Sequence, residues 1–66
     1  MRLTLNGKPL ECPAAATLEA LLRDLGIRDA RLATVVNDEI VPASRRAARA
    51  LQDVDRIELL TLAGGG

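Results

Sequence analysis

Residues 17–27 read TLEALLRDLGI, and this stretch predicts the one regular helix of the chain. Its leucines stand at positions 18, 21, 22 and 25, the i, i+3, i+4, i+7 spacing that places them on one face of a helix. Thr17 can cap the start through its hydroxyl, and Gly26 stands where a left-handed residue ends a helix. Ile27 is then placed to contact Leu22 in a Schellman-type closure. We expect the leucine stripe to pack on one side of a sheet.

A β-hairpin is predicted before this helix. Residues 1–5 alternate apolar and polar side chains, which is the period of a half-buried strand. The dipeptide Asn6-Gly7 follows and suits the positive φ angles of a type I′ turn. Residues 10–12 then alternate again, so the chain is expected to return antiparallel to its first strand.

A second hairpin is predicted after the helix. Residues 32–37 are apolar and β-branched without a helical period, and the apolar residues 40–41 follow the turn-prone pair Asp38-Glu39. Pro42 should end this hairpin, because proline has no N–H to give to a sheet.

The rest of the chain predicts a crossover and a last strand. Residues 44–51 are rich in Ala and Arg and favour one or two helical turns with Ser44 as the cap. Residues 53–55 suit a turn, and residues 56–62 alternate as a strand. The fold class is therefore α+β, a ubiquitin-like β-grasp with a mixed sheet of about five strands packed on one main helix. A ferredoxin-like fold would need a second full helix, which residues 44–51 barely supply.

With 66 residues the chain is expected to form one domain over residues 1–62, followed by a flexible glycine tail over residues 63–66. No Phe, Tyr or Trp is present, so the core must be aliphatic. We expect an interior formed by Leu3, Leu5, Leu21, Leu22 and Ile57.

The composition argues against an enzyme and against a metal site. The chain has no His, one Cys and one Ser, which excludes general acid–base work by His, Ser-His or Cys-His nucleophiles, and metal centres built on His and Cys. Cys12 stands in the apolar phase of a strand and is expected in the core. The acidic pairs Asp53/Asp55 and Asp38/Glu39 are interpreted as turn residues, since neither pair has the further oxygen ligands that calcium requires.

The charges give no sign of a nucleic-acid or membrane partner. Nine Lys and Arg balance nine Asp and Glu, and no aromatic side chain is present to stack on a base. No run of about 18 apolar residues occurs, and a single cysteine suits a reducing compartment, so we expect a cytoplasmic protein. Arg45, Arg46 and Arg49 are interpreted as a solvated helical face, with binding of a phosphate or an acidic partner as the alternative.

The ending Gly64-Gly65-Gly66 directly follows the last predicted strand. Glycine has no Cβ, so such an end can thread a narrow channel and present a terminal carboxylate inside another protein. The alternative is a disordered end without function.

Taken together, these residues resemble the ThiS sulfur carriers of thiazole biosynthesis, within the wider ubiquitin-like group that includes the molybdopterin carriers. The likeness runs the whole length of the chain. Its signposts are Asn6-Gly7, Thr17-Leu18, Leu21-Leu22, Leu25-Gly26, Val36-Asn37, Ile40-Val41-Pro42, Asp55, Ile57-Glu58 and the Gly-Gly ending. The chain departs from the family at Val54, where many relatives have Gly, and at Ala43, where many have Arg.

The resemblance implies a carrier without catalytic residues of its own. A ThiF-type, E1-like enzyme would use ATP and magnesium to adenylate the carboxylate of Gly66, with Gly64 and Gly65 as the threading arm. A persulfide would then convert Gly66 to a thiocarboxylate, the sulfur donor for thiazole synthase of the ThiG type. The chain itself would bind no cofactor.

Two other classes of function stay open. A carrier of the same chemistry could serve molybdopterin, a thiolated tRNA base or cysteine. A ubiquitin-like modifier or docking module would instead use the tail for an isopeptide bond or not at all. A carrier must bind at least two partners and release them, so we expect a docking patch beside the tail formed by Leu60 and Leu62, which share the strand phase opposite to Ile57 and Leu59. The alternative is that these two residues form a second buried face.

Overall fold

The computed structural model describes residues 1–27 and 32–61. Its elements, in chain order, are β1 (Arg2–Leu5), β2 (Lys8–Glu11), α1 (Leu18–Asp24), β3 (Leu32–Val36), β4 (Glu39–Val41), a 3₁₀ turn (Ala43–Arg45) and β5 (Arg56–Thr61).

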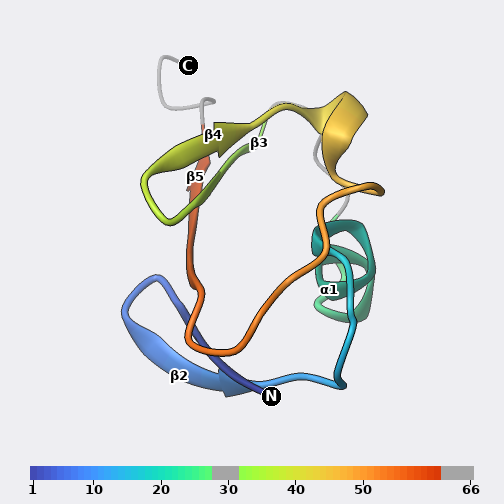
Figure 1. Cartoon of the computed structure of the whole chain (residues 1–66). Coiled ribbons are helices and arrows are strands. Elements are labelled where there is room, and N and C mark those ends of the chain that lie inside the picture. The colour runs from blue at the N-terminus through green and yellow to red at the C-terminus, as the bar shows by residue number, and fades with distance from the viewer. Residues whose placement is uncertain (28–31, 62–66) are drawn as a thin grey trace.

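The five strands form one mixed sheet in the order β2-β1-β5-β3-β4. β5 is parallel to β1, with Leu5 opposite Ile57, and antiparallel to β3 from Leu32↔Thr61 to Val36↔Ile57. Figure 1 shows β5 between the two hairpins, with α1 to one side of the sheet. The predicted β-grasp architecture, with the last strand inserted beside the first, is confirmed.

Both hairpins turn on two residues with positive φ. Asn6 and Gly7 have φ angles of 50° and 83°, the predicted type I′ geometry. In the second hairpin the turn residues are Asn37 and Asp38, with φ of 52° and 69°, while Glu39 pairs with Val36 as the first residue of β4. The predicted Asp38-Glu39 turn is therefore wrong by one residue, because Asn accepts the left-handed region more readily than Glu does.

The helix has the predicted ends. The hydroxyl oxygen of Thr17 accepts a hydrogen bond of 3.1 Å from the amide of Ala20. Gly26 has φ +75°, and the amide of Ile27 donates to the carbonyl of Leu22 at 2.9 Å, which is the Schellman bond. Leu25 is the exception: it is the C-cap residue and is 40% exposed, because the stripe leaves the sheet where α1 ends.

The core lies between α1 and the inner face of the sheet. Its buried apolar residues are Leu3, Cys12, Leu18, Leu21, Leu22, Leu32, Val36, Val41, Leu51 and Ile57. Four of the five predicted interior residues are among them. Leu5 is only half-buried and packs against the margin of the core, since β1 ends there and the chain turns into the hairpin.

The crossover is a 3₁₀ turn preceded by Pro42, so Ser44 lies inside the turn and is not the predicted cap. Arg46 follows the turn, and its guanidinium donates to Thr34 Oγ1 at 3.3 Å and to the carbonyl of Leu32. The buried Thr34 hydroxyl in turn donates to Val41 O at 2.6 Å. Arg46 therefore holds the crossover against β3, and the expectation of a solvated side chain is wrong for this arginine.

Candidate functional site

β5 leads toward the C-terminus of the chain. Its backbone amides at Arg56 and Leu59 donate hydrogen bonds to side chains of the two hairpin turns. Asn37 Oδ1 accepts a hydrogen bond of 2.9 Å from the amide of Arg56 at the start of the strand. Asn6 Oδ1 accepts one of 2.9 Å from the amide of Leu59. The two hairpin turns thus each place an asparagine side chain on a backbone N–H of β5.

The predicted tail site lies outside the described residues. Gly64, Gly65 and Gly66 belong to this undescribed part, as does Leu62 of the predicted patch, and the structure describes the chain as far as Thr61. The tail roles therefore stay predictions, while the strand that leads to the tail has defined contacts.

Leu60 is 51% exposed on the outer face of the sheet, opposite the helix side. It pairs with Ala33 of β3, and Val35, two residues further on in β3, pairs with Ile40 of β4, which is 76% exposed. These four residues form what we call the outer apolar patch. A hollow of about 310 Å³ lies beside Leu60, with Thr4 and Glu58 in its lining. The strand phase correctly predicts the exposure of Leu60, whereas the sequence places Ile40 only in a hairpin and does not predict its exposure.

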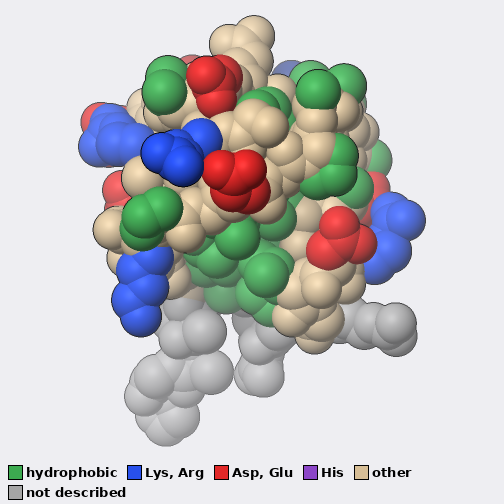
Figure 2. Space-filling view, turned by 90° about the horizontal axis from the view of Figure 1, so that it is seen from below, with side chains coloured by type: hydrophobic (Ala, Val, Ile, Leu, Met, Phe, Trp, Pro, Cys, Tyr) green, Lys and Arg blue, Asp and Glu red, His purple; other side chains and the backbone are tan. Residues whose placement is uncertain are grey.

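Charges of both signs are interspersed on the surface seen in Figure 2, with apolar side chains between them. No single-sign field covers that face. This agrees with the balance of nine basic and nine acidic residues.

Cys12 is 8% exposed, as predicted. Burial raises the pKa of its thiol above the ordinary value, so the neutral form is favoured. A buried neutral thiol is a poor nucleophile.

The acidic residues have structural roles. Asp55 is 6% exposed, and its carboxylate accepts from Asn37 Nδ2 at 2.9 Å and from the amide of Gln52 at 2.8 Å. Asp53 accepts from the amide of Arg2 at 2.8 Å. Asp38 forms an exposed ion pair of 2.8 Å with Arg56. Within the described ranges no group of three or more His, Cys, Asp or Glu side chains could hold a metal ion.

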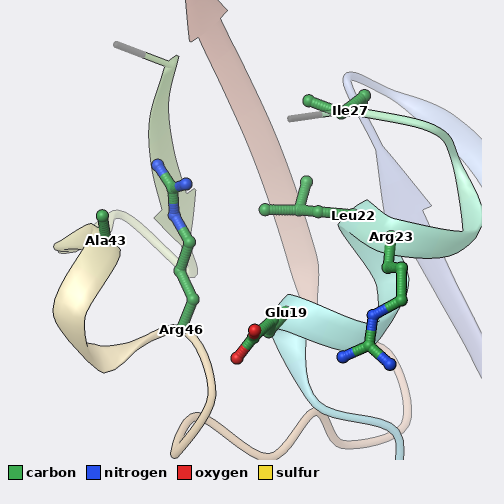
Figure 3. A pocket seen from close by; sticks show the side chains of 6 residues that line it. All are labelled: Glu19, Leu22, Arg23, Ile27, Ala43 and Arg46. Atoms are coloured by element: carbon green, nitrogen blue, oxygen red, sulfur yellow. The ribbon is translucent and has the colours of Figure 1, made fainter. Parts of the chain in front are cut away.

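A cavity of about 360 Å³ lies between α1 and the crossover, and no sequence pattern predicts it. Figure 3 shows the Glu19 carboxylate pointing from α1 toward Arg46 of the crossover, while the Arg23 side chain runs down along α1. Leu22 and Ile27 also line the cavity. Its charged lining consists of one carboxylate and two guanidinium groups and contains no hydroxyl, thiol or amine nucleophile. Of the other predicted arginines, Arg45 is exposed and Arg49 donates to the carbonyl of Ala50.

The described residues offer a central strand and an outer apolar patch, and no catalytic cluster occurs among them. None of the helices described has the length and hydropathy needed to cross a membrane.

Known proteins share both the sequence and the fold. The ThiS family model matches residues 3–66. The sulfur carrier protein ThiS of Escherichia coli is 35% identical over 66 residues, which cover all of both chains. A thiazole synthase of Paramagnetospirillum magneticum is 41% identical over the whole of this chain, which spans only 20% of that protein. The crystal structure of a thiamine biosynthesis protein (ThiS) from Geobacter metallireducens superposes with a TM-score of 0.87 at 30% identity and covers 100% of both chains. The chain belongs to the ThiS family, as a sulfur carrier protein of thiamine biosynthesis and not an enzyme.

Proposed function

We propose that the carboxylate of Gly66 is the group that carries the sulfur. A partner enzyme of the ThiF type, using ATP and magnesium, first joins this carboxylate to the α-phosphate and releases pyrophosphate. The step is needed because a carboxylate anion is a poor electrophile, whereas an acyl adenylate has AMP as a good leaving group. The terminal sulfur of a persulfide on the enzyme then attacks the acyl carbon and displaces AMP, which gives an acyl disulfide. A second thiol of the enzyme cleaves the S–S bond of this acyl disulfide, forms a disulfide with the remaining sulfur and releases the thiocarboxylate of the carrier.

The observation that carries this proposal is the family match, which extends to residue 66 and so includes the glycine ending. The one thiol of the chain, Cys12, is buried, and the buried carboxylate of Asp55 accepts hydrogen bonds from Asn37 and Gln52. We accordingly divide the chain into a folded domain over residues 1–62 and a flexible tail over residues 63–66. Gly64 and Gly65 would form the arm that enters the enzyme, since residues without Cβ fit a narrow channel.

The outer apolar patch is the proposed docking surface. Leu60 and Ile40 are 51% and 76% exposed, so a partner can bury both side chains, and Leu62 would extend the patch toward the tail. Burial of such side chains drives association without fixed charges, which suits a carrier that must bind and leave several partners.

We infer that one of these partners is a thiazole synthase of the ThiG type. The proteins named thiazole synthase from Paramagnetospirillum magneticum and Magnetococcus marinus contain a segment similar to this whole chain, and it makes up 20% of each protein. A carrier joined to a synthase implies that the two act in sequence, because linkage raises the effective concentration of one for the other. We place this chemistry in the cytoplasm, on the ground of the single reduced cysteine.

A one-residue C-terminal extension tests the proposal. With the adenylating enzyme, ATP and magnesium, the natural chain should support exchange of labelled pyrophosphate into ATP, and the chain extended by one Ala should not. The same Ala added at the N-terminus is the matched control and should leave the exchange intact. Equal exchange by natural and C-terminally extended chains would overturn the role of Gly66. A ladder of larger adducts in cells, in place of sulfur transfer, would indicate a ubiquitin-like modifier instead.

A further inference from the structure

Asn6 extends the hydrogen bonding between β1 and β5 past Leu5, which is the last residue of β1 that pairs with β5. The backbone register between the two strands covers only Thr4↔Arg56 and Leu5↔Ile57. The amide of Asn6 still donates to Ile57 O at 2.8 Å, and the chain then turns away through Gly7. The side-chain oxygen of Asn6 accepts from the amide of Leu59 at 2.9 Å. In a continued parallel ladder the backbone carbonyl of Asn6 would accept this N–H, and the side-chain oxygen of Asn6 takes its place.

Within residues 1–27 and 32–61, this bond is the last one that β5 makes on its β1 side. Beyond Leu59, the strand is paired with β3 alone, through Ala33↔Leu60 and Leu32↔Thr61. A strand held on one side opens more easily than one held on both sides, so Asn6 sets where the firmly held part of β5 ends.

We propose that Asn6 is a positioning residue for the activation of Gly66. By holding Leu59, it fixes the length and direction of the segment that reaches from the sheet into the adenylating enzyme. This inference rests on the proposed function. Five residues follow Thr61, and their extended reach is at most about 17 Å. Without the Asn6 bond, β5 would be held by β3 alone from Leu59 onward and would open more easily. Each residue that opens adds to the part that must be ordered on binding and costs conformational entropy.

Two substitutions isolate the side-chain acceptor from the turn. Asn6→Gly keeps the positive φ of 50° without strain and removes only the acceptor. Asn6→Asp keeps an oxygen in the same place and also tolerates this conformation. Asn37→Gly is the matched control, because Asn37 has φ 52° in the other hairpin and holds Arg56 at the opposite end of β5.

The measurements are amide hydrogen exchange at Leu59 and the KM and kcat of each full chain in pyrophosphate exchange with the adenylating enzyme. Asn6→Gly should speed exchange at Leu59 and raise KM about fivefold, the equivalent of one net hydrogen bond, with kcat unchanged. Asn6→Asp should have the Leu59 exchange rate and the KM of the natural chain. Asn37→Gly should lower the melting temperature at least as much as Asn6→Gly does, since it also removes the hydrogen bond from Asn37 to Asp55. It should nevertheless leave KM as in the natural chain.

An unchanged KM for Asn6→Gly would show that Asn6 has only a structural role. The same conclusion would follow if KM rose in both Asn6→Gly and Asn37→Gly in proportion to their loss of stability. These results would leave the role of Gly66 untouched as long as the natural chain is adenylated. Failure of the natural chain itself to be adenylated would instead refute the proposed function, and the positioning role with it.

Discussion

The side-chain amide of Asn37 donates a hydrogen bond of 2.9 Å to Oδ1 of Asp55, and it joins the turn of the second hairpin to the turn that precedes β5. The other carboxylate oxygen of Asp55 accepts from the amide of Gln52 at 2.8 Å. Asp55 thus orders both turns at the start of the strand that leads to the tail.

Replacing Asp55 with Ala should destabilise the fold by about 1–3 kcal/mol. The change leaves the amide of Gln52 and the side chain of Asn37 without their acceptor in a partly buried place. Urea unfolding measures the loss. Asp38→Asn is the control: its ion pair with Arg56 is exposed, and the expected change is below about 1 kcal/mol. Equal losses for the two variants would contradict the structural role assigned to Asp55.

Val54→Gly should stabilise the protein by about 1 kcal/mol. Val54 has φ +63°, a conformation that costs an L-residue roughly 1–2 kcal/mol and is least suited to a β-branched side chain. At 79% exposure the valine side chain gives little packing in return, although the greater entropy of glycine in the unfolded chain offsets part of the gain. Val54→Ala keeps Cβ and should gain less. A lower urea midpoint for the glycine variant would show that this turn is not strained.

Leu22→Ala should cost about 2–5 kcal/mol, because the side chain is 4% exposed in the core and its removal leaves a cavity. Leu25→Ala, one turn further along the same leucine stripe, should cost less than about 1 kcal/mol, because Leu25 is 40% exposed. Thermal unfolding of both variants is the measurement. A melting temperature unchanged by Leu22→Ala would refute the packing of α1.

Leu22 and Leu25 show which features of the fold the sequence alone predicts and which it does not. The cap at Thr17, the Schellman closure at Gly26 and the Asn6-Gly7 turn depend on residues close in sequence, and all three were predicted correctly. The exposure of Leu25 depends on where α1 stops relative to the sheet, which a spacing pattern does not contain. Arg46 is a similar case, since its partners Thr34 and Leu32 are distant in sequence and become neighbours only when the crossover meets β3.

The candidate site also contains features that local sequence predicts and features that depend on the fold. Leu60 could be found because strand alternation distinguishes the two faces of a sheet. The contact of Asn6 with Leu59 spans 53 positions and requires the parallel β1–β5 register, which no local pattern encodes. The second turn was misplaced because Asn37, Asp38 and Glu39 are all compatible with a loop, and the choice between them is made by the pairing of Val36 with Glu39.

Leu60→Asp should weaken binding to the adenylating enzyme about tenfold or more and leave the fold intact. The side chain is 51% exposed, so the charge stays solvated in the free protein but must be desolvated in a complex. Leu59→Asp is the contrasting variant, since Leu59 packs against the core and a charge there should unfold the protein. Binding is measured by calorimetry and folding by circular dichroism. Global unfolding of Leu60→Asp would mean that the outer face is itself part of a core.

Mass spectrometry tests most directly our proposal that the transferred sulfur resides on the carboxyl group of Gly66. The natural chain is incubated with the ThiF-type enzyme, ATP, magnesium and a persulfide donor, and its intact mass and fragment masses are then read. We expect the mass gain of one sulfur in place of one oxygen, confined to fragments that contain Gly66, and no gain in the chain that lacks Gly65 and Gly66. Sulfur found on Cys12, or equal sulfur uptake after removal of Gly65 and Gly66, would contradict the account.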